Sequence, residues 1–232
     1  MHISSAEFYC SAPDLASCPE EALPEFAFIG RSNVGKSSLV NLLAGREGLA
    51  RVSATPGHTK LINFFTISRR WRLVDLPGYG FAEVARKDKA RFNEAVAEYL
   101  AKRPNLKGLF LLIDSSLPPQ KIDLEFVQWL AGIGAPIVIV FTKCDKASGT
   151  KVKANMEAFL AQLSAWFEPL PLVFTCSAIT GVGRAELLGV IDQALAELPV
   201  PAKTSESQAP VRTAEPPSMK ARRAPWNKLS GA

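Results

Sequence analysis

The chain is poor in the residues that bind structural metals or form disulfide frameworks. It has only two histidines, His2 and His58, and its four cysteines include no C-x-x-C pair. A structural zinc site requires four closely spaced ligands, so we exclude such a site. We expect the thiols to be free and reduced.

Long hydrophobic runs are also missing. The longest candidates, APIVIVF and GLFLLI, have the length of a strand, whereas a helix that spans a bilayer needs about 20 apolar residues. The N-terminus has neither the basic region nor the apolar core of an export signal. We therefore expect a cytoplasmic protein with no membrane partner.

Charge is unevenly distributed along the 232 residues. Residues 201–232 carry six basic and two acidic side chains, a net +4 of the formal +5 of the whole chain. This segment is rich in Pro, Ser and Ala, so it cannot bury enough apolar surface to offset the entropy of ordering. We predict a disordered basic tail over residues 199–232, one domain over residues 23–198, and an N-terminal segment, residues 1–22, that packs on this domain.

Between these ends, short apolar runs alternate with segments of helical periodicity. Continuous apolar runs such as IVIVF are typical of strands buried on both faces, and the helices between them are typical of right-handed crossovers. The pattern predicts an α/β fold, a three-layer α/β/α sandwich whose sheet is mostly parallel with one antiparallel pair at its edge. The expected strands cover residues 25–29, 61–67, 71–76, 108–113, 137–141 and 172–175. The expected helices cover residues 36–44, 88–102, 123–130, 152–163 and 184–195.

A phosphate-binding loop follows the first of these strands. It matches the pattern G-x-x-x-x-G-K-[ST] between a strand and a helix. Its glycines let consecutive backbone N–H groups point at phosphate oxygens, the helix N-terminus favours negative charge, and Lys36 supplies a charge on the β- and γ-phosphates. The predicted nucleotide contacts here are Gly30, Arg31, Ser32, Asn33, Val34, Gly35, Lys36, Ser37 and Ser38.

A second box, VDLPGYGFA, contains the D-x-x-G of nucleotide-hydrolysing switches. Its predicted nucleotide contacts are Asp75, Leu76, Pro77 and Gly78. Asp75 is expected to face the metal ion and Gly78 the terminal phosphate. In well-known switches of this class the next residue is a Gln that orients the attacking water, whereas here it is Tyr79, whose phenol cannot replace an amide. Hydrolysis then depends on electrostatic stabilisation by Lys36, the metal and the backbone, and we expect it to be slow.

Two further boxes select the base. TKCD closes the strand IVIVF, and the carboxylate of Asp145 can accept both N1–H and N2–H₂ of guanine, a donor pair that adenine lacks. CSA closes the next strand, where a backbone N–H can reach guanine O6. The predicted base contacts are Thr142, Lys143, Cys144, Asp145, Cys176, Ser177 and Ala178. Since open α/β sheets bind ligands at the carboxyl ends of their strands, the four boxes together predict GTP and GDP as ligands.

The segment between Ala44 and Leu61 should contribute a threonine to a Mg²⁺ ion when the γ-phosphate is present. Thr55 and Thr59 both lie there. We favour Thr59, because it directly precedes a strand and follows Gly57. The predicted nucleotide contacts of this segment are Gly57, His58 and Thr59. The predicted Mg²⁺ ligands are Ser37, Thr59 and, through water, Asp75.

These boxes together resemble the EngB family (also called YihA/YsxC) of bacterial GTPases, in the TrmE-Era-EngA-EngB-septin class. The matching text is GRSNVGKSSLVN, ATPGHTKLINFF, VDLPGYGFA, TKCDK and CSAITGVG, and the resemblance covers about residues 6–197. His58 and the pair Ser115-Ser116 depart from residues common in the family. The resemblance implies assistance in assembly of the large ribosomal subunit, with ribosomal RNA and ribosomal proteins as partners. It also suggests that Asn33 holds a K⁺ ion beside the phosphates, which adds Asn33 to Lys36 and Gly78 as candidate catalytic residues. A monomer is the default expectation.

Basic residues give this ribosomal role partial support. Six of them follow the second box: Arg86, Lys87, Lys89, Arg91, Lys102 and Arg103. A nucleotide-sensitive RNA contact is expected at this position, and an ordinary solvated helix face is the alternative. The tail sequence KARRAPWNK is either an RNA-binding arm with Trp226 as a stacking anchor or a solubilising tail. A function of another class also remains open, a GTP-gated protein-binding switch in cell division with no ribosomal role.

Overall fold

The computed structural model describes residues 1–20, 23–50, 61–80 and 86–198. The strands are β1 (Ala6–Ala12), β2 (Glu25–Gly30), β3 (Ile62–Ile67), β4 (Trp71–Asp75), β5 (Leu106–Asp114), β6 (Ile137–Thr142) and β7 (Leu172–Thr175). The helices are α1 (Lys36–Ala44), α2 (Arg86–Lys102), α3 (Lys121–Ile133), α4 (Gly149–Leu163) and α5 (Arg184–Glu197). The strands and helices predicted from the sequence are all confirmed, with ends that differ by a few residues.

The strands form one sheet in the order β1-β3-β4-β2-β5-β6-β7. The pairs from β4 to β7 are parallel, and β3 runs antiparallel to both of its neighbours, β1 and β4. The α/β fold with an antiparallel edge pair is therefore confirmed, and β1 extends that edge by one strand. The sequence did not predict β1 because its side chains do not alternate. Only Ala6 and Ala12 are buried, and a register shift lies between Phe8 and Cys10.

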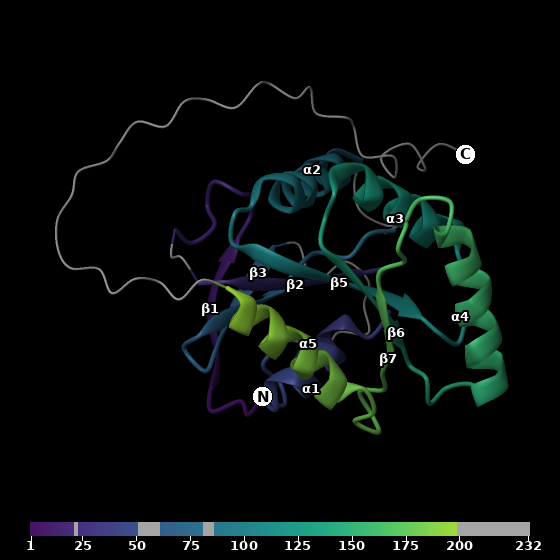
Figure 1. Cartoon of the computed structure of the whole chain (residues 1–232). Helices are drawn as coiled ribbons and strands as arrows, with labels where there is room; N and C mark the ends of the chain where they lie inside the picture. The colour runs from purple at the N-terminus through teal and green to yellow at the C-terminus, as the bar shows by residue number, and fades with distance from the viewer. Residues whose placement is uncertain (21–22, 51–60, 81–85, 199–232) are drawn as a thin grey trace, which may run out of the picture.

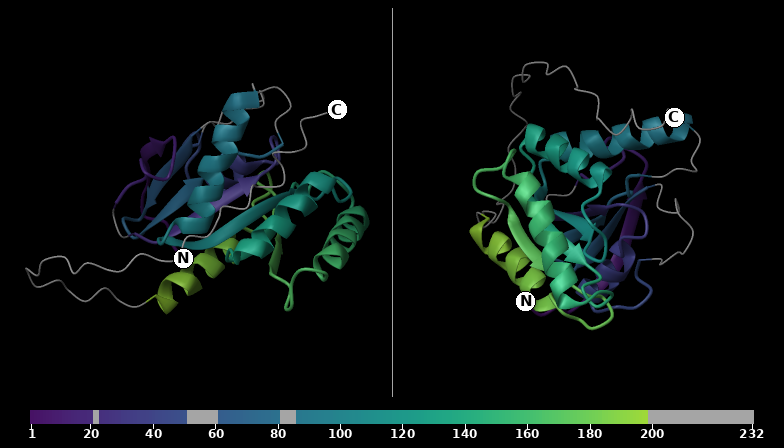
Figure 2. Two further views of the ribbon diagram at one scale, coloured as in Figure 1. Left: turned by 90° about the horizontal axis from the view of Figure 1, so that it is seen from above. Right: turned by 90° about the vertical axis from the view of Figure 1, so that its right-hand side faces the viewer.

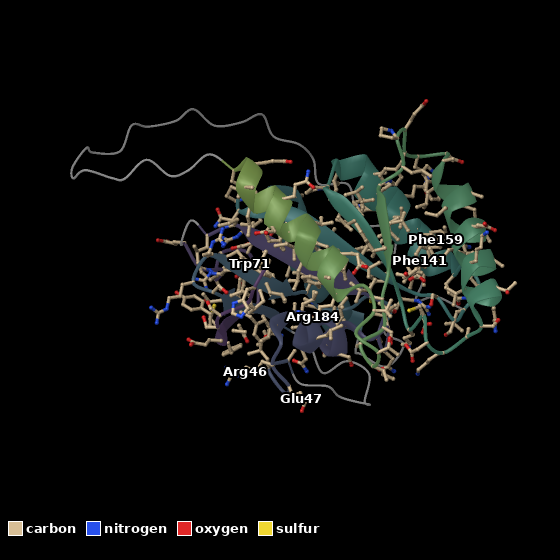
Figure 3. The ribbon with its side chains drawn as sticks, turned by 60° about the horizontal axis from the view of Figure 1, so that its bottom comes forward. Arg46, Glu47, Trp71, Phe141, Phe159 and Arg184 are labelled. Carbon is tan, nitrogen blue, oxygen red and sulfur yellow. The ribbon has the colours of Figure 1, made fainter. Side chains whose placement is uncertain are left out.

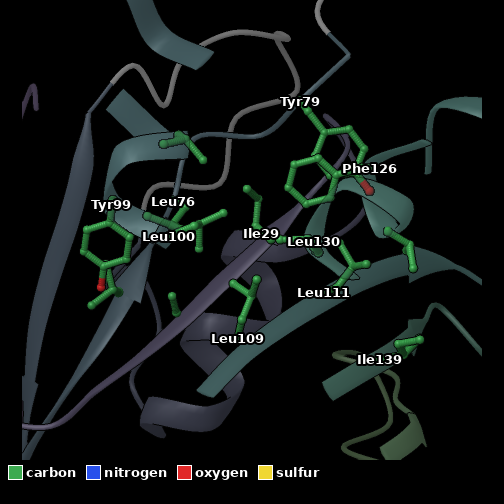
Figure 4. Packing of buried hydrophobic residues seen from close by; sticks show 14 of the residues in the cluster. Ile29, Leu76, Tyr79, Tyr99, Leu100, Leu109, Leu111, Phe126, Leu130 and Ile139 are labelled. Carbon is green, nitrogen blue, oxygen red and sulfur yellow. The ribbon is translucent and has the colours of Figure 1, made fainter. Parts of the chain in front are cut away.

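Helices cover both faces of the sheet, which gives three layers (Figures 1 and 2). α1 and α5 lie on one face, where Leu39 and Leu188 share a buried cluster with Phe28 of β2. α2, α3 and α4 lie on the other face, where Tyr99 and Phe126 belong to a second buried cluster, shown in Figure 4. None of the helices in the described ranges is both long and apolar enough to traverse a bilayer.

Two arginines connect elements on the α1/α5 face (Figure 3). Arg184, the first residue of α5, donates to the carbonyl oxygens of Leu42 and Leu43 in the last turn of α1, at 2.7 and 3.1 Å. The Leu42 carbonyl also accepts the N–H of Gly45, the C-cap of α1, at 3.2 Å. A cation at a helix C-terminus is favourable. Arg46 donates to the carbonyl oxygen of Ala6 at 2.7 Å, and this contact ties β1 to the end of α1.

A buried carboxylate connects several segments where β2 begins, at the end of this strand opposite to Gly30. Glu25 is fully buried and accepts hydrogen bonds from the Tyr99 hydroxyl at 2.7 Å and from Arg103 at 2.5 and 2.9 Å. Arg103 also donates to the carbonyl oxygen of Pro19 at 2.6 Å, which fastens the N-terminal segment to α2. The interpretation of Arg103 as an RNA contact is therefore wrong, because its side chain is only 8% exposed and is already paired. Lys102 is exposed and pairs with Glu98.

Candidate nucleotide-binding site

The phosphate loop runs from Gly30, the last residue of β2, to Lys36, the first residue of α1. Asn33 and Gly35 have left-handed backbones, with φ of 63° and 98°, and they curl the loop. Gly35 is the N-cap of α1, and within the described ranges no side-chain hydrogen bond caps this end of the helix. The free N–H groups and the positive end of the helix form a site suited to a phosphate.

Ser32 adds an unsatisfied polar group to this loop. Its hydroxyl is buried and has no hydrogen-bond partner among the described residues. Buried polar groups in folded proteins are almost always paired. A phosphate oxygen in the loop would accept this hydrogen bond, so the orphaned hydroxyl fits a nucleotide ligand.

Lys36 and Asp75 meet between the phosphate loop and the second box. They are 8% and 3% exposed, and the Lys36 ammonium donates to Oδ1 of Asp75. Asp75 ends β4 beside the start of α1 because β4 pairs in parallel with β2. The two strand ends thus bring the predicted phosphate-binding cation and the predicted metal-facing carboxylate into contact.

The oxygen donors at this place fit a Mg²⁺ ion that is shared with the nucleotide. Ser37 lies in the first turn of α1, and its hydroxyl and the Asp75 carboxylate are the hard oxygen donors that Mg²⁺ prefers. No group of three His, Cys, Asp or Glu side chains able to hold a metal occurs in the described ranges. Mg²⁺ binds nucleotides through one or two protein oxygens, phosphates and water. Gly57, His58 and Thr59 lie outside the described residues, as does Thr55.

Tyr79, the residue in the place of the catalytic Gln, is buried. Its hydroxyl donates to Oδ1 of Asp123 at 2.9 Å, and its ring stacks on Phe126 with 4.2 Å between the ring centroids. Burial, reinforced by the negative charge of Asp123, raises the pKa of Tyr79 well above its usual range, so the phenol stays protonated. The hydroxyl and the ring of Tyr79 both contact α3, so this side chain is not placed to orient a water molecule on the phosphate.

Arg31 was predicted to contact the nucleotide, but its side chain is directed to α3. Its Nε donates to both carboxylate oxygens of Asp123, at 3.0 and 3.1 Å. Leu76 and Pro77, which were predicted to contact the nucleotide from the second box, are buried.

Asp123 was not predicted as a site residue. A signal for it exists in the sequence, since Asp123 shares the helical face of Phe126, Val127 and Leu130, where an apolar residue is expected.

The first two residues of the TKCD box hold the phosphate loop in place. The Thr142 hydroxyl donates to the carbonyl oxygen of Val34 at 2.7 Å. The Lys143 ammonium donates to the carbonyl oxygen of Asn33 and to Asp114 Oδ2, both at 2.6 Å. Burial raises the pKa of Asp114, but hydrogen bonds from Lys143 and Ser116 outweigh it and leave the pKa below its usual value. Asp114 was not predicted as a site residue, although it closes a strand as the boxes do.

One cavity joins the phosphate loop to the base-selecting boxes. Its lining residues are Gly35, Ser38, Leu39, Thr142, Lys143, Asp145, Lys146, Cys176, Ala178 and Ile179. The Asp145 carboxylate is exposed and has no hydrogen-bond or ion-pair partner in the described part of the chain, so it is free to accept the two donors of guanine. The Cys144 N–H donates to the carbonyl oxygen of Cys176 at 3.2 Å and joins the two loops. The Ser177 hydroxyl accepts two backbone N–H bonds, which shape the second loop.

Two solved structures share the fold of this chain. A crystal structure titled as a probable GTP-binding protein EngB has a TM-score of 0.61 and 23% identity, over 75% of this chain and all of that chain. Aquifex aeolicus Era bound to GDP and AlF4⁻ also has a TM-score of 0.61, with 22% identity over 78% of this chain and 59% of that chain. At these identities the two structures establish the fold alone.

Sequence relatives are much closer. The family described as "50S ribosome-binding GTPase" matches residues 25–143. A Bacteroides fragilis protein named "Probable GTP-binding protein EngB" is 50% identical over 198 residues, which are 85% of this chain and 98% of the relative. A protein of the same name from Bacteroides thetaiotaomicron is 50% identical over 192 residues, 83% of this chain and 95% of the relative. With a P-loop GTPase fold and such identity over nearly the full length of these relatives, the chain belongs to the EngB family of GTP-binding proteins.

Proposed function

We propose that this GTP-binding protein is a nucleotide-gated factor in assembly of the large ribosomal subunit. The description of the matching family, a 50S ribosome-binding GTPase, supports a partner of this kind. Era, which shares the fold over 60% of its own chain, has been solved with MgGDPNP and nucleotides 1506–1542 of 16S ribosomal RNA, so a protein that contains this fold can have a ribosomal RNA partner. No observation favours the alternative, a switch in cell division.

We propose further that hydrolysis without the ribosome is slow. The single observation that carries this proposal is the bond between Tyr79 and Asp123, which occupies the side chain at the position of the water-orienting Gln. A switch that also lacks an arginine finger hydrolyses its nucleotide about 10³- to 10⁵-fold more slowly than one that has it. The large subunit would then supply the missing group and couple hydrolysis to assembly.

Lys36, Gly78 and the phosphate loop would bind the phosphates, and Asp145 with the CSA loop would bind guanine. Ser37, Thr59 and, through water, Asp75 would hold Mg²⁺, which would supply positive charge to the phosphates. We also propose a monomer located in the cytoplasm. Its G domain would span residues 23–198, with residues 1–22 packed on it and a disordered tail over residues 199–232, which lies outside the described residues.

Potassium is expected to accelerate hydrolysis through Asn33. The Asn33 side chain is exposed and makes no hydrogen bond within the described ranges, so its amide oxygen is free to bind a cation beside the phosphates. Single-turnover hydrolysis in KCl should be at least about tenfold faster than in NaCl of equal ionic strength. Asn33→Gly keeps the left-handed backbone accessible and should abolish the difference. Equal rates in the two salts would exclude the potassium site.

Sedimentation with large ribosomal subunits tests the proposed function. The full chain should co-migrate with the subunit in a non-hydrolysable GTP analogue and be released in GDP. A chain that ends at residue 198 should still respond to the nucleotide if the G domain makes the gated contact. Failure to co-migrate with mature or immature subunits in both nucleotides would remove the ribosomal assignment and leave GTP binding intact.

A further inference from the structure

Asp123, in the first turn of α3, joins two segments of the nucleotide site in one buried cluster. Its side chain is only 1% exposed. Arg31 of the phosphate loop donates to both of its oxygens, at 3.0 and 3.1 Å, and the Tyr79 hydroxyl of the second box donates to Oδ1 at 2.9 Å. These partners lie 92 and 44 positions away in the sequence. One carboxylate therefore links both phosphate-facing segments to the same helix.

The ring of Tyr79 strengthens the link to α3. It stacks on Phe126, one turn beyond Asp123, with a centroid distance of 4.2 Å and an interplanar angle of 19°. Figure 4 shows the two rings side by side at the edge of the buried cluster. The Tyr79 side chain is thus held both by its hydroxyl and by its ring, and the backbone next to it has little freedom.

That backbone belongs to Gly78, which lies directly on the phosphate loop. The Tyr79 N–H donates to the carbonyl oxygen of Gly30 at 3.2 Å. A Cβ added to Gly78 would lie 2.8 Å from the same oxygen and 3.5 Å from the nitrogen of Ser32, so only glycine fits. Whatever holds Tyr79 therefore also holds Gly78 next to the place where phosphates bind.

Because Asp123 is buried, one arrangement of its two partners, Arg31 and Tyr79, is favoured. Desolvation raises the pKa of Asp123, and Arg31 and then Tyr79 oppose that shift. A buried carboxylate that loses a partner is strongly destabilised. The positions of Arg31 and Tyr79 in which both reach Asp123 are therefore favoured over arrangements in which either side chain turns away.

We propose that Asp123 is a positioning residue for recognition of the terminal phosphate. By holding Tyr79 and Arg31, it keeps Gly78 against the phosphate loop, where the Gly78 N–H meets the γ-phosphate of GTP. This inference rests on the proposed role of Gly78 as a γ-phosphate contact. Since the segment is ordered in advance, less binding free energy is lost on fixing it when GTP binds. GDP has no γ-phosphate and gains nothing from this ordering.

Tyr79→Phe tests the proposal, because it removes the hydroxyl and keeps the ring on Phe126. Affinity for a non-hydrolysable GTP analogue, measured by calorimetry on the full chain, should fall about tenfold. Affinity for GDP should stay within about twofold. Asp123→Asn should lower the ratio of the two affinities in the same direction, and the double variant should be no worse than Asp123→Asn, because both changes break one interaction.

Tyr99→Phe is a matched control. The Tyr99 hydroxyl donates to buried Glu25 at 2.7 Å beside Arg103, so this cluster also joins a tyrosine and an arginine to a buried carboxylate, but at the start of β2 rather than at its end. It should lower the thermal midpoint as much as Tyr79→Phe does and leave the ratio of affinities unchanged. Equal losses for both nucleotides in Tyr79→Phe, no loss, or the same change of ratio in Tyr99→Phe would each overturn the proposal. Ribosomes take no part in this measurement, so its failure is distinct from failure of the proposed function.

Discussion

The Asp145→Asn variant is expected to lose guanine nucleotides and to bind xanthine nucleotides in their place. The carboxylate accepts two donors of guanine, and an amide would place its own donor against guanine N2–H₂. Two hydrogen bonds to a charged group contribute about 1.5–3 kcal/mol each, so GDP affinity should fall at least about 100-fold. Xanthine carries a carbonyl where guanine has the amino group, so the amide can donate to it.

The fold should be unaffected by this change. Asp145 is exposed and has no partner in the described residues, and surface substitutions of this kind change stability by about 0.5 kcal/mol or less. Calorimetric titration with GDP and xanthosine diphosphate measures the switch. Glu157→Gln, which removes an exposed carboxylate on α4, is the control and should bind GDP normally. Unchanged GDP affinity in Asp145→Asn would refute the assignment of this residue to the base.

Replacing Lys36 by Met should abolish hydrolysis and weaken binding of a GTP analogue at least about 100-fold. The ammonium is the cation at the start of α1, and it is buried, so water cannot substitute for it. The same change leaves the Asp75 carboxylate buried without Lys36. We therefore expect a loss of about 3–5 kcal/mol in the free energy of unfolding.

A second variant separates these two effects. When both partners of a buried ion pair are replaced by neutral groups, much of the stability returns. Lys36→Met combined with Asp75→Asn should therefore unfold at a temperature closer to that of the wild type and still fail to bind the analogue. Lys153→Ala, an exposed lysine on α4, should behave as the wild type in both measurements. Recovery of GTP-analogue binding in the double variant would show that Lys36 acts only through stability.

Much of the fold could be predicted because local patterns determine it. The apolar run of β6 and the helical spacing in α1 are readable within a dozen residues, and burial on both faces follows from the alternation of strands and helices. β1 could not be predicted, because only pairing with β3 makes Ala6–Ala12 a strand. Because only Ala6 and Ala12 of this strand are buried, its sequence shows no alternation of apolar and polar residues.

The residues of the candidate site likewise include some that the sequence predicts and some that it does not. The phosphate loop, the second box and TKCD are contiguous motifs whose chemistry follows from residue type and spacing, so they were found directly. Asp123 and Asp114 are single acidic residues that become part of the site only when strands and helices meet. Carboxylates are usually exposed. The helical spacing of Asp123 with Phe126, Val127 and Leu130 indicates that its side chain faces the core, but it does not predict the tyrosine and the arginine that meet it there.

The sequence by itself determined the order of the elements from β2 onward, the nucleotide boxes and the family, because each is written in neighbouring residues. Only the tertiary structure decided that Tyr79 is bound to Asp123 and that Arg103 is buried on Glu25 rather than free for RNA. These pairs join residues 44 and 78 positions apart. The physical reason is that burial and charge pairing depend on which distant segments the packed sheet and helices bring together.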